Sequence, residues 1–168
     1  MFGDEAAVYH APTKTRMYAE RGHPPVILSP GGHDHFNLMG AVAPIQGEVT
    51  NGFVVEMNAR VYIKFLRRVL WRYKEYRKIY IITDNARIHH AKIVMKFLER
   101  IDFKIEIIFL PPYSPELSPM EQVWKYMRKD VTHNTFYYLM DDLKSALRQF
   151  FEKIKFGCEE IRSLCNFY

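Results

Sequence analysis

The sequence lacks the segments that membrane and secreted proteins usually carry. No apolar run approaches the ~18 residues that a membrane-spanning helix needs. The first residues contain two acids and no basic stretch, so they do not resemble a signal peptide. Only two cysteines are present, Cys158 and Cys165, and no histidine lies near them, which fits neither a zinc site nor a disulfide scaffold. We therefore expect reduced thiols in a cytoplasmic protein.

The composition favours one well-packed domain with an anionic partner. Of 168 residues, 48% are hydrophobic and 15% aromatic, which excludes a disordered chain and allows a sizeable core. No internal repeat divides the sequence. The net charge is +5, from 24 Lys and Arg against 19 Asp and Glu. A basic excess favours nucleic acid, because each neutralised phosphate releases counterions, although many basic proteins bind none.

The first half of the chain predicts a hairpin followed by a helix. Residues 36–43 and 49–57 are rich in strand-forming side chains, and residues 46–48 supply a turn between them. A helix is then expected from Asn58, which can cap it, to about residue 76, because its apolar side chains recur at helical spacing.

The second half predicts a βαβ unit and then helices. Residues 78–83 form a short apolar run typical of a buried strand, and residues 104–110 form another. A helix over about residues 89–101 separates them, which indicates a parallel pair. After the proline-rich run at 111–119, helices are expected at about 119–131 and 139–155. The whole chain therefore predicts an α/β fold, a mixed sheet covered by helices.

Asp84 follows the predicted strand at 78–83. Ligands bind at the carboxyl ends of strands in open α/β sheets, and a carboxylate there is held by a rigid element, as a metal ligand requires. The alternative is that Asp84 or Asn85 caps the next helix.

Two further acids have equally open interpretations. Ser118-Pro119-Met120-Glu121 has the pattern of a capping box, in which Glu121 reaches back to the amide of Ser118. Alternatively, the stiff proline run directs Glu121 towards a metal, with Glu116 as a rival. Near the N-terminus, Asp4 and its neighbour Glu5 are locally indistinguishable from solvated surface acids.

Three blocks of sequence, taken together, carry a family resemblance. They are FGDEA at 2–6, ITDNARIHH at 82–90 and LPPYSPELSPMEQVW at 110–124. In this order they resemble the catalytic domain of mariner-type DDE transposases, especially the prokaryotic insertion-sequence branch. The third block is the most specific, and the 36 residues between Asp84 and Glu121 are close to what the family shows.

The resemblance implies a fold and a site. The fold would be RNase H-like, a five-stranded mixed sheet flanked by helices. Asp4 would lie on the first strand, Asp84 at the end of the neighbouring fourth strand, and Glu121 on the helix after the proline run. We expect these three carboxylates to hold two Mg2+ or Mn2+ ions, with Asp4 bridging both and the other two each completing one.

The resemblance also implies a reaction and partners. A DNA transposase cleaves strands at transposon ends and transfers the freed 3′-hydroxyl into target DNA, usually as a homodimer on DNA, here in association with the nucleoid. Helix-turn-helix DNA-binding segments usually precede this domain. Only three residues precede Asp4, so we expect residues 1–168 to be a single catalytic domain without that region.

Other polar residues near Asp84 are secondary candidates. Asn85 can orient Asp84. His89 and His90 are expected at the start of a helix, as structural residues or DNA contacts. Arg87 and the basic helix at residues 60–74 either track phosphate or are simply solvated.

Two other functions remain open at this stage. One is an inactive or repurposed transposase remnant that binds nucleic acid or partners. The other is a nuclease of the RNase H or junction-cutting type on the same fold, against which the long proline block argues.

Overall fold

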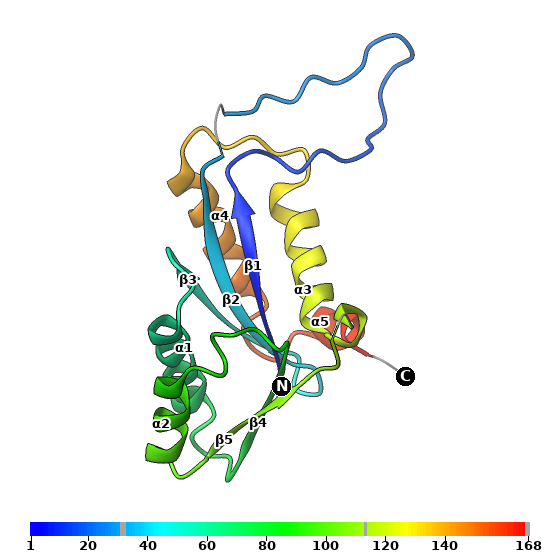
Figure 1. Ribbon diagram of the computed structural model, residues 1–168. Coiled ribbons are helices and arrows are strands. Elements are labelled where there is room, and N and C mark those ends of the chain that lie inside the picture. Colours follow the sequence, from blue (N-terminus) through cyan, green and yellow to red (C-terminus); the bar gives the residue numbers. More distant parts are fainter. Residues whose placement is uncertain (31–32, 113, 167–168) are drawn as a thin grey trace.

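The strands form one mixed sheet at the centre of the fold. The computed structural model describes residues 1–30, 33–112 and 114–166, and within them five strands pair in the order β3-β2-β1-β4-β5 (Figure 1). The strands are β1 (Phe2–Tyr9), β2 (His35–Ala43), β3 (Glu48–Val54), β4 (Ile79–Thr83) and β5 (Ile105–Phe109). The first three are antiparallel neighbours, whereas β4 is parallel to β1 and β5 is parallel to β4.

The sheet places β1 between the hairpin and the βαβ unit. β1 pairs with β2 along its whole length, with Asp4 opposite Gly40. It pairs with β4 over a much shorter stretch, at Phe2 opposite Ile82. The predicted hairpin and the two predicted parallel strands are confirmed, as is the first strand that the family resemblance implied.

Helices cover both faces of the sheet. One core cluster joins β2, β4 and β5 to α1 (Ala59–Arg72) and α2 (Lys92–Arg100). The other joins β1, β2 and β3 to α3 (Met120–Met127), α4 (Met140–Lys153) and α5 (Glu159–Leu164). Two short helical turns flank α3, η1 (Pro115–Leu117) and the π-type turn η2 (Arg128–Thr132). No helix in the described part of the chain is both long and apolar enough to cross a membrane.

Several helix boundaries differ from the sequence prediction. Asn58 caps α1 as expected, with its side-chain oxygen accepting from the Val61 amide at 3.0 Å, but the helix ends at Arg72. The predicted helix at 89–101 begins only at Lys92, so His89 and His90 lie in the turn before it. The predicted position of these two histidines at a helix start was wrong, because the chain first folds into a turn stabilised by Asp84, whose carboxylate accepts from the Ala86 amide at 3.1 Å.

The helices after the proline run are also divided differently. The single helix predicted at 119–131 is α3 followed by η2, and α5 was not predicted at all. Cys165 is buried against α3 and α5 residues of the core, and Cys158 is half-buried; both are free thiols, as expected.

Gly40 allows α3 to approach the sheet closely. A Cβ atom at this position would lie 2.3 Å from Met120 Cε and 2.7 Å from the Trp124 ring. Both side chains are fully buried, so neither can move aside without disturbing the core. The missing side chain at Gly40 is therefore a requirement of the packing.

We expect Gly40→Ala to lower the free energy of unfolding by about 1–3 kcal/mol, because overpacking a filled core costs roughly this amount. Chemical denaturation measures the change. Gly52→Ala is the matched control on the neighbouring strand, since its nearest new contact is an ordinary 3.4 Å to the Arg68 side chain. Equal stability of the two variants would contradict this account.

Candidate active site

The three acids expected from the resemblance line one cavity. Asp4 comes from β1, Asp84 directly follows β4, and Glu121 lies in the first turn of α3. The cavity has a volume of about 380 Å³. Its other walls come from Gly3, Asn85, Ser118 and the segment after β5, which contributes Leu110, Pro111, Pro112 and Ser114. Residues more than 110 positions apart in the sequence thus share one space.

Asp4 is the most constrained of the three carboxylates. The Trp124 indole Nε1 donates a hydrogen bond to Asp4 Oδ2 at 3.0 Å. The pKa of Asp4 is raised to about 6, mainly by burial. Hydrogen bonds from the Glu5 backbone and Trp124 oppose the rise, and the negative charges of Glu121 and Asp84 contribute to it. Trp124 is buried between α3 and the sheet and also orients Asp4.

Asp84 is held by neutral donors at the mouth of the cavity. Its side chain is 60% exposed, and its Oδ1 lies 3.1 Å from the Ala86 amide and 3.2 Å from His89 Nε2. The alternative that Asp84 or Asn85 caps the next helix is not found, because α2 begins after Ala91 and has no side-chain cap. Asn85 lines the cavity, and its side-chain oxygen pairs with His90 Nε2.

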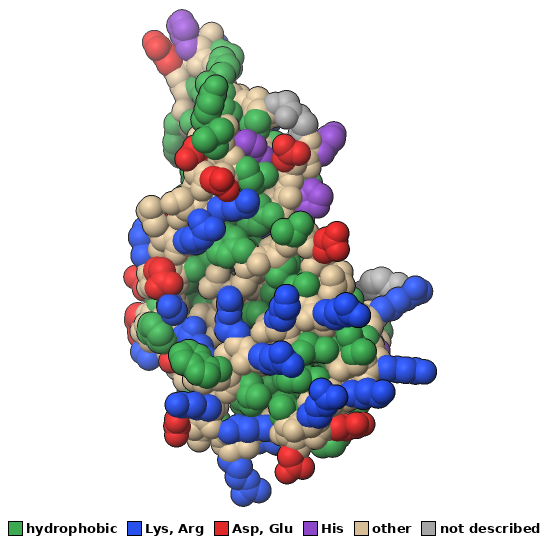
Figure 2. Space-filling view, turned by 90° about the vertical axis from the view of Figure 1, so that its left-hand side faces the viewer, with side chains coloured by type: hydrophobic (Ala, Val, Ile, Leu, Met, Phe, Trp, Pro, Cys, Tyr) green, Lys and Arg blue, Asp and Glu red, His purple; other side chains and the backbone are tan. Residues whose placement is uncertain are grey.

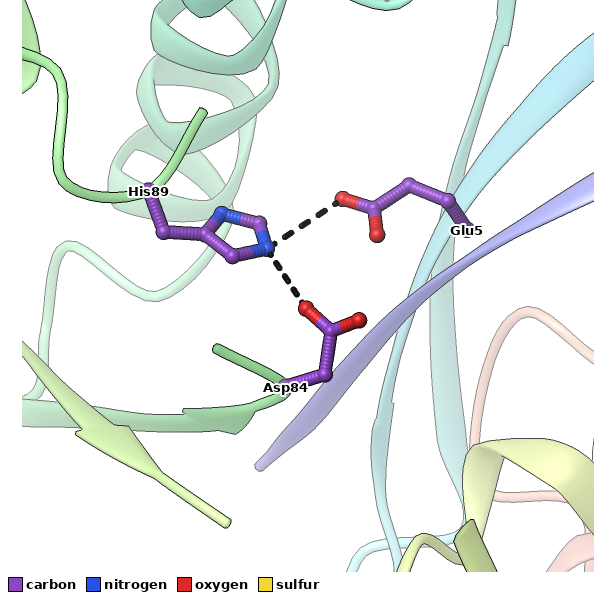
Figure 3. A group of neighbouring side chains, drawn as sticks. All are labelled: Glu5, Asp84 and His89. Carbon is purple, nitrogen blue, oxygen red and sulfur yellow. Dashed lines mark hydrogen bonds and ion pairs between the residues drawn. The ribbon is translucent and has the colours of Figure 1, made fainter. Parts of the chain in front are cut away.

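Glu5 and His89 form a second group behind Asp84 (Figure 3). Side chains alternate along a strand, so Glu5 points to the face opposite Asp4, towards α1. His89 is only 1% exposed, and its Nε2 lies 3.8 Å from Glu5 Oε1, between that carboxylate and Asp84. Within the described residues, Glu5, Asp84 and His89 are the one group whose ligand atoms all lie within 4.8 Å of one another.

Burial governs the ionisation of this group. Burial, together with the smaller effect of the negative charges of Asp4 and Asp84, raises the pKa of Glu5 to about 8. Burial also lowers the pKa of His89, although Asp84 partly opposes this. Sequence reasoning gave Glu5 no role. The available signal was its position, because the residue after a buried strand acid faces the opposite helix layer.

Glu121 is free to face the cavity because it does not cap its helix. The N-cap of α3 is Pro119, which makes no side-chain cap bond, and the Ser118 hydroxyl is buried without a partner. The capping-box interpretation is therefore wrong. Glu121 instead lies 3.9 Å from an Arg128 guanidinium nitrogen. Its rival Glu116 lines a different cavity, with Leu117, Glu159 and Arg162.

The lining of the 380 Å³ cavity suits a hard divalent cation. Its charged groups are three carboxylates that repel one another, and carboxylate oxygens are the ligands that Mg2+ and Mn2+ prefer. The only cation close to any of them is Arg128, at its 3.9 Å distance from Glu121, among the ion pairs of the described residues. His89 adds a nitrogen ligand on the far side of Asp84, a set that suits transition metals better than Mg2+.

Sequence comparison identifies the family. A family model described as DDE superfamily endonuclease matches residues 1–144. The chain belongs to the DDE endonuclease superfamily. It is 25% identical over 153 residues to the insertion element IS630 uncharacterized 39 kDa protein of Shigella sonnei, a match that covers 91% of this chain and 44% of that protein. This chain thus spans less than half the length of that relative.

Structural comparison confirms the RNase H-like fold of this DDE domain. The catalytic domain of Mos1 mariner transposase matches with a TM-score of 0.62 and 19% identity, over 98% of this chain and 76% of that one. The Mos1 transposase paired-end complex with left transposon end gives a TM-score of 0.70 at 20% identity, over 98% of this chain and 52% of that one. The five-stranded mixed sheet with helices on both faces is therefore the expected one.

Because the pKa of Asp4 is raised, replacing its carboxyl group should stabilise the folded protein at high pH but not at low pH. Because the folded-state pKa, about 6, exceeds the ordinary 3.8, the chain loses stability as Asp4 ionises between about pH 4 and pH 6. Without divalent cations, we expect Asp4→Asn to raise the free energy of unfolding at pH 8 by about 1–3 kcal/mol and to leave it nearly unchanged below pH 4.

Urea unfolding in a chelating buffer at the two pH values measures this difference. Asp34→Asn serves as the control, since Asp34 is exposed, and it is expected to change neither value. An equal gain in the free energy of unfolding at both pH values would mean that the negative charge of Asp4 does not destabilise the folded protein.

Proposed function

We propose that this chain is the catalytic domain of a DNA transposase, which cleaves DNA strands at the ends of a mobile element and joins the freed 3′-hydroxyl to target DNA. Membership of the DDE endonuclease superfamily supports the reaction class. The observation that carries the proposal is the shared cavity of Asp4, Asp84 and Glu121. These three residues are the proposed catalytic carboxylates.

Two divalent cations, Mg2+ or Mn2+, are the proposed cofactors. The three carboxylates would hold them, with Asp4, the innermost and most tightly oriented, as the ligand common to both. When bound, such a pair activates a water or hydroxyl nucleophile and stabilises the charge on the leaving oxygen. The fit rests on the donor set, which consists of carboxylate oxygens whose one ion-pair partner with a Lys or Arg among the described residues is Arg128, beside Glu121.

The protein itself contributes orientation. The Trp124 indole fixes Asp4 from the α3 side, and the His89 imidazole fixes Asp84 from the α2 side. Both are neutral donors, so they direct the carboxylates without cancelling their charge. Pro111 and Pro112 form a stiff opposite wall, which limits how a phosphodiester can enter the cavity. Small misplacements of ligands are costly in such chemistry, so this rigidity serves the reaction.

DNA is the proposed substrate, and a homodimer on DNA is the proposed assembly. The structurally similar Mos1 transposase has been solved in a paired-end complex with a transposon end, and in paired-end complexes with Mg and with Mn. We propose that this chain likewise acts on paired DNA ends.

We expect Asp84→Asn and Glu121→Gln each to reduce strand cleavage at least about 100-fold, because each change removes a charged ligand of the proposed cations. The measurement is nicking and joining of labelled DNA by the purified chain with Mn2+. Glu116→Gln is the matched control, since Glu116 lies in the proline-rich run shortly before Glu121 but outside the cavity.

The outcome separates the enzyme from an inactive remnant. Cleavage by the wild-type chain that survives Asp84→Asn would remove the site assignment. Equal losses in Glu121→Gln and Glu116→Gln would point to a disturbed proline segment. A wild-type chain that binds but never cuts DNA, in the presence of either metal, would favour a repurposed remnant.

His89 is proposed to position Asp84, and it can be tested through metal affinity. We expect His89→Ala to weaken Mn2+ binding by about 10–100-fold, because groups that orient metal ligands typically contribute that much. Isothermal titration calorimetry measures the affinity. His90→Ala is the control, since His90 is exposed, pairs with Asn85 and stacks on Phe109 instead. Complete loss of binding in His89→Ala would instead make His89 a direct ligand.

A further inference from the structure

The basic excess of the chain is concentrated in two helices. Helices α1 and α2 together contain eight basic residues and one acidic residue, a net charge of +7. The whole chain carries +5, so all remaining residues together carry −2. The positive charge is therefore a property of one layer of the fold and not of the surface in general.

The basic side chains form two rows on the outer side of this layer. Arg60, Lys64 and Arg67 recur at intervals of four and three along α1, and Lys92 and Lys96 recur at an interval of four along α2, so each set lies on one helix face. All five are exposed. Figure 2 shows this side of the molecule, with Lys and Arg side chains spread over the two helices. We call these five residues the α1–α2 basic face.

The two rows are adjacent and lack internal counter-charges. The Arg67 guanidinium lies over the Phe97 ring of α2, 5.7 Å from its centroid, so the rows meet. None of the five residues takes part in an ion pair with any described residue. On the opposite layer, by contrast, Lys144 pairs with Asp141 and Lys155 with Glu152. The α1–α2 basic face thus has charge available for an external anion.

The α1–α2 basic face is connected to the carboxylate cavity. Each of the two helices leads into a strand that is parallel to β1, so both helices begin towards the edge of the sheet where Asp84 follows β4. The exposed loop that starts with Asp84 and Asn85 carries Arg87 and leads directly into Lys92 at the start of α2. Helix N-termini add favourable partial charge for phosphate.

We propose that the α1–α2 basic face binds the phosphate backbone of the double-stranded DNA that extends away from the carboxylate cavity. The proposal rests on DNA being the substrate, as proposed above. Residues four apart on a helix are separated by roughly 6 Å along its axis, and the axes of neighbouring helices lie about 8–10 Å apart. The two rows therefore form a regular array of positive charges, which suits the regularly spaced phosphates of DNA. Contacts of this kind supply affinity and orientation without reading sequence.

The test compares two triple variants of the 168-residue chain. Arg60→Gln, Lys64→Gln and Lys96→Gln are combined in one, and the control combines Lys129→Gln, Arg148→Gln and Lys153→Gln on the other side of the molecule, so both lose one Arg and two Lys, all exposed. Fluorescence anisotropy with a labelled duplex of arbitrary sequence measures the affinity in a chelating buffer over a series of KCl concentrations.

We expect the first triple variant to bind the duplex at least about tenfold more weakly. The slope of log affinity against log salt concentration is negative, and we expect its magnitude to decrease by about 2–3, because each lost phosphate contact reduces that magnitude by nearly one. The control triple is expected to keep the wild-type slope. Equal losses in both variants would overturn the proposal, since net charge alone would then explain binding. A loss of affinity for poly-glutamate as large as that for DNA would overturn the assignment to DNA.

Two readouts keep this proposal separate from the proposed function. If the first triple variant loses duplex binding while the wild-type chain never cleaves DNA, the α1–α2 basic face is retained and the transposase reaction is rejected. If the wild-type chain cleaves DNA with Mn2+ while the first triple variant binds the duplex as well as wild type, the reaction is retained and the surface is rejected.

Discussion

Negative charge is crowded where β1, β4 and α3 approach one another, and this crowding shapes the candidate site. Asp4, Glu5, Asp84 and Glu121 meet there, and burial and mutual repulsion raise the pKa of Asp4 to about 6 and that of Glu5 to about 8. Buried carboxylates are usually paired with cations. Here the nearest donors to Asp4 and Asp84 are an indole, a backbone amide and an imidazole whose pKa is lowered, and none of these neutralises the charge. The fold fixes the directions of Asp4 and Asp84, and the proposed cations would balance the negative charge that remains.

The position of β1 in the sheet is what brings the two helix layers to one site. Because side chains alternate along a strand, Asp4 meets α3 through Trp124, and Glu5 meets the α1 and α2 layer through His89. The close approach of Trp124 depends in turn on Gly40, the residue opposite Asp4 on β2. Adjacent carboxylates on β1 therefore contact residues of both helix layers. A change in the packing of either layer is expected to alter the orientation of one of these carboxylates.

The sequence predicted those features that depend on neighbouring residues and missed those that depend on distant ones. Periodicity and turn residues gave the hairpin, the cap at Asn58 and the two parallel strands, because each is encoded within a few residues. The start of α2 was wrong because the Asp84 carboxylate, by accepting from the Ala86 amide, holds a turn where helical periodicity begins. The apparent capping box at Ser118 failed because Pro119 takes the N-cap position. The pairing of Glu5 with His89 joins segments 84 residues apart, and no local pattern encodes such a contact.

The acidic cavity and the basic helices α1 and α2 interact with a polyanion such as DNA in opposite ways. DNA phosphates are repelled by a cluster of carboxylates, so the proposed catalytic site would not attract DNA by itself before cations are bound. The α1 and α2 layer, with a net charge of +7, is attractive before any cation arrives, and its charges are not consumed by internal ion pairs with described residues. The loop from Asp84 to Lys92 joins the repulsive and attractive regions within nine residues. The two proposals thus assign affinity and chemistry to different parts of the fold, which this short loop connects.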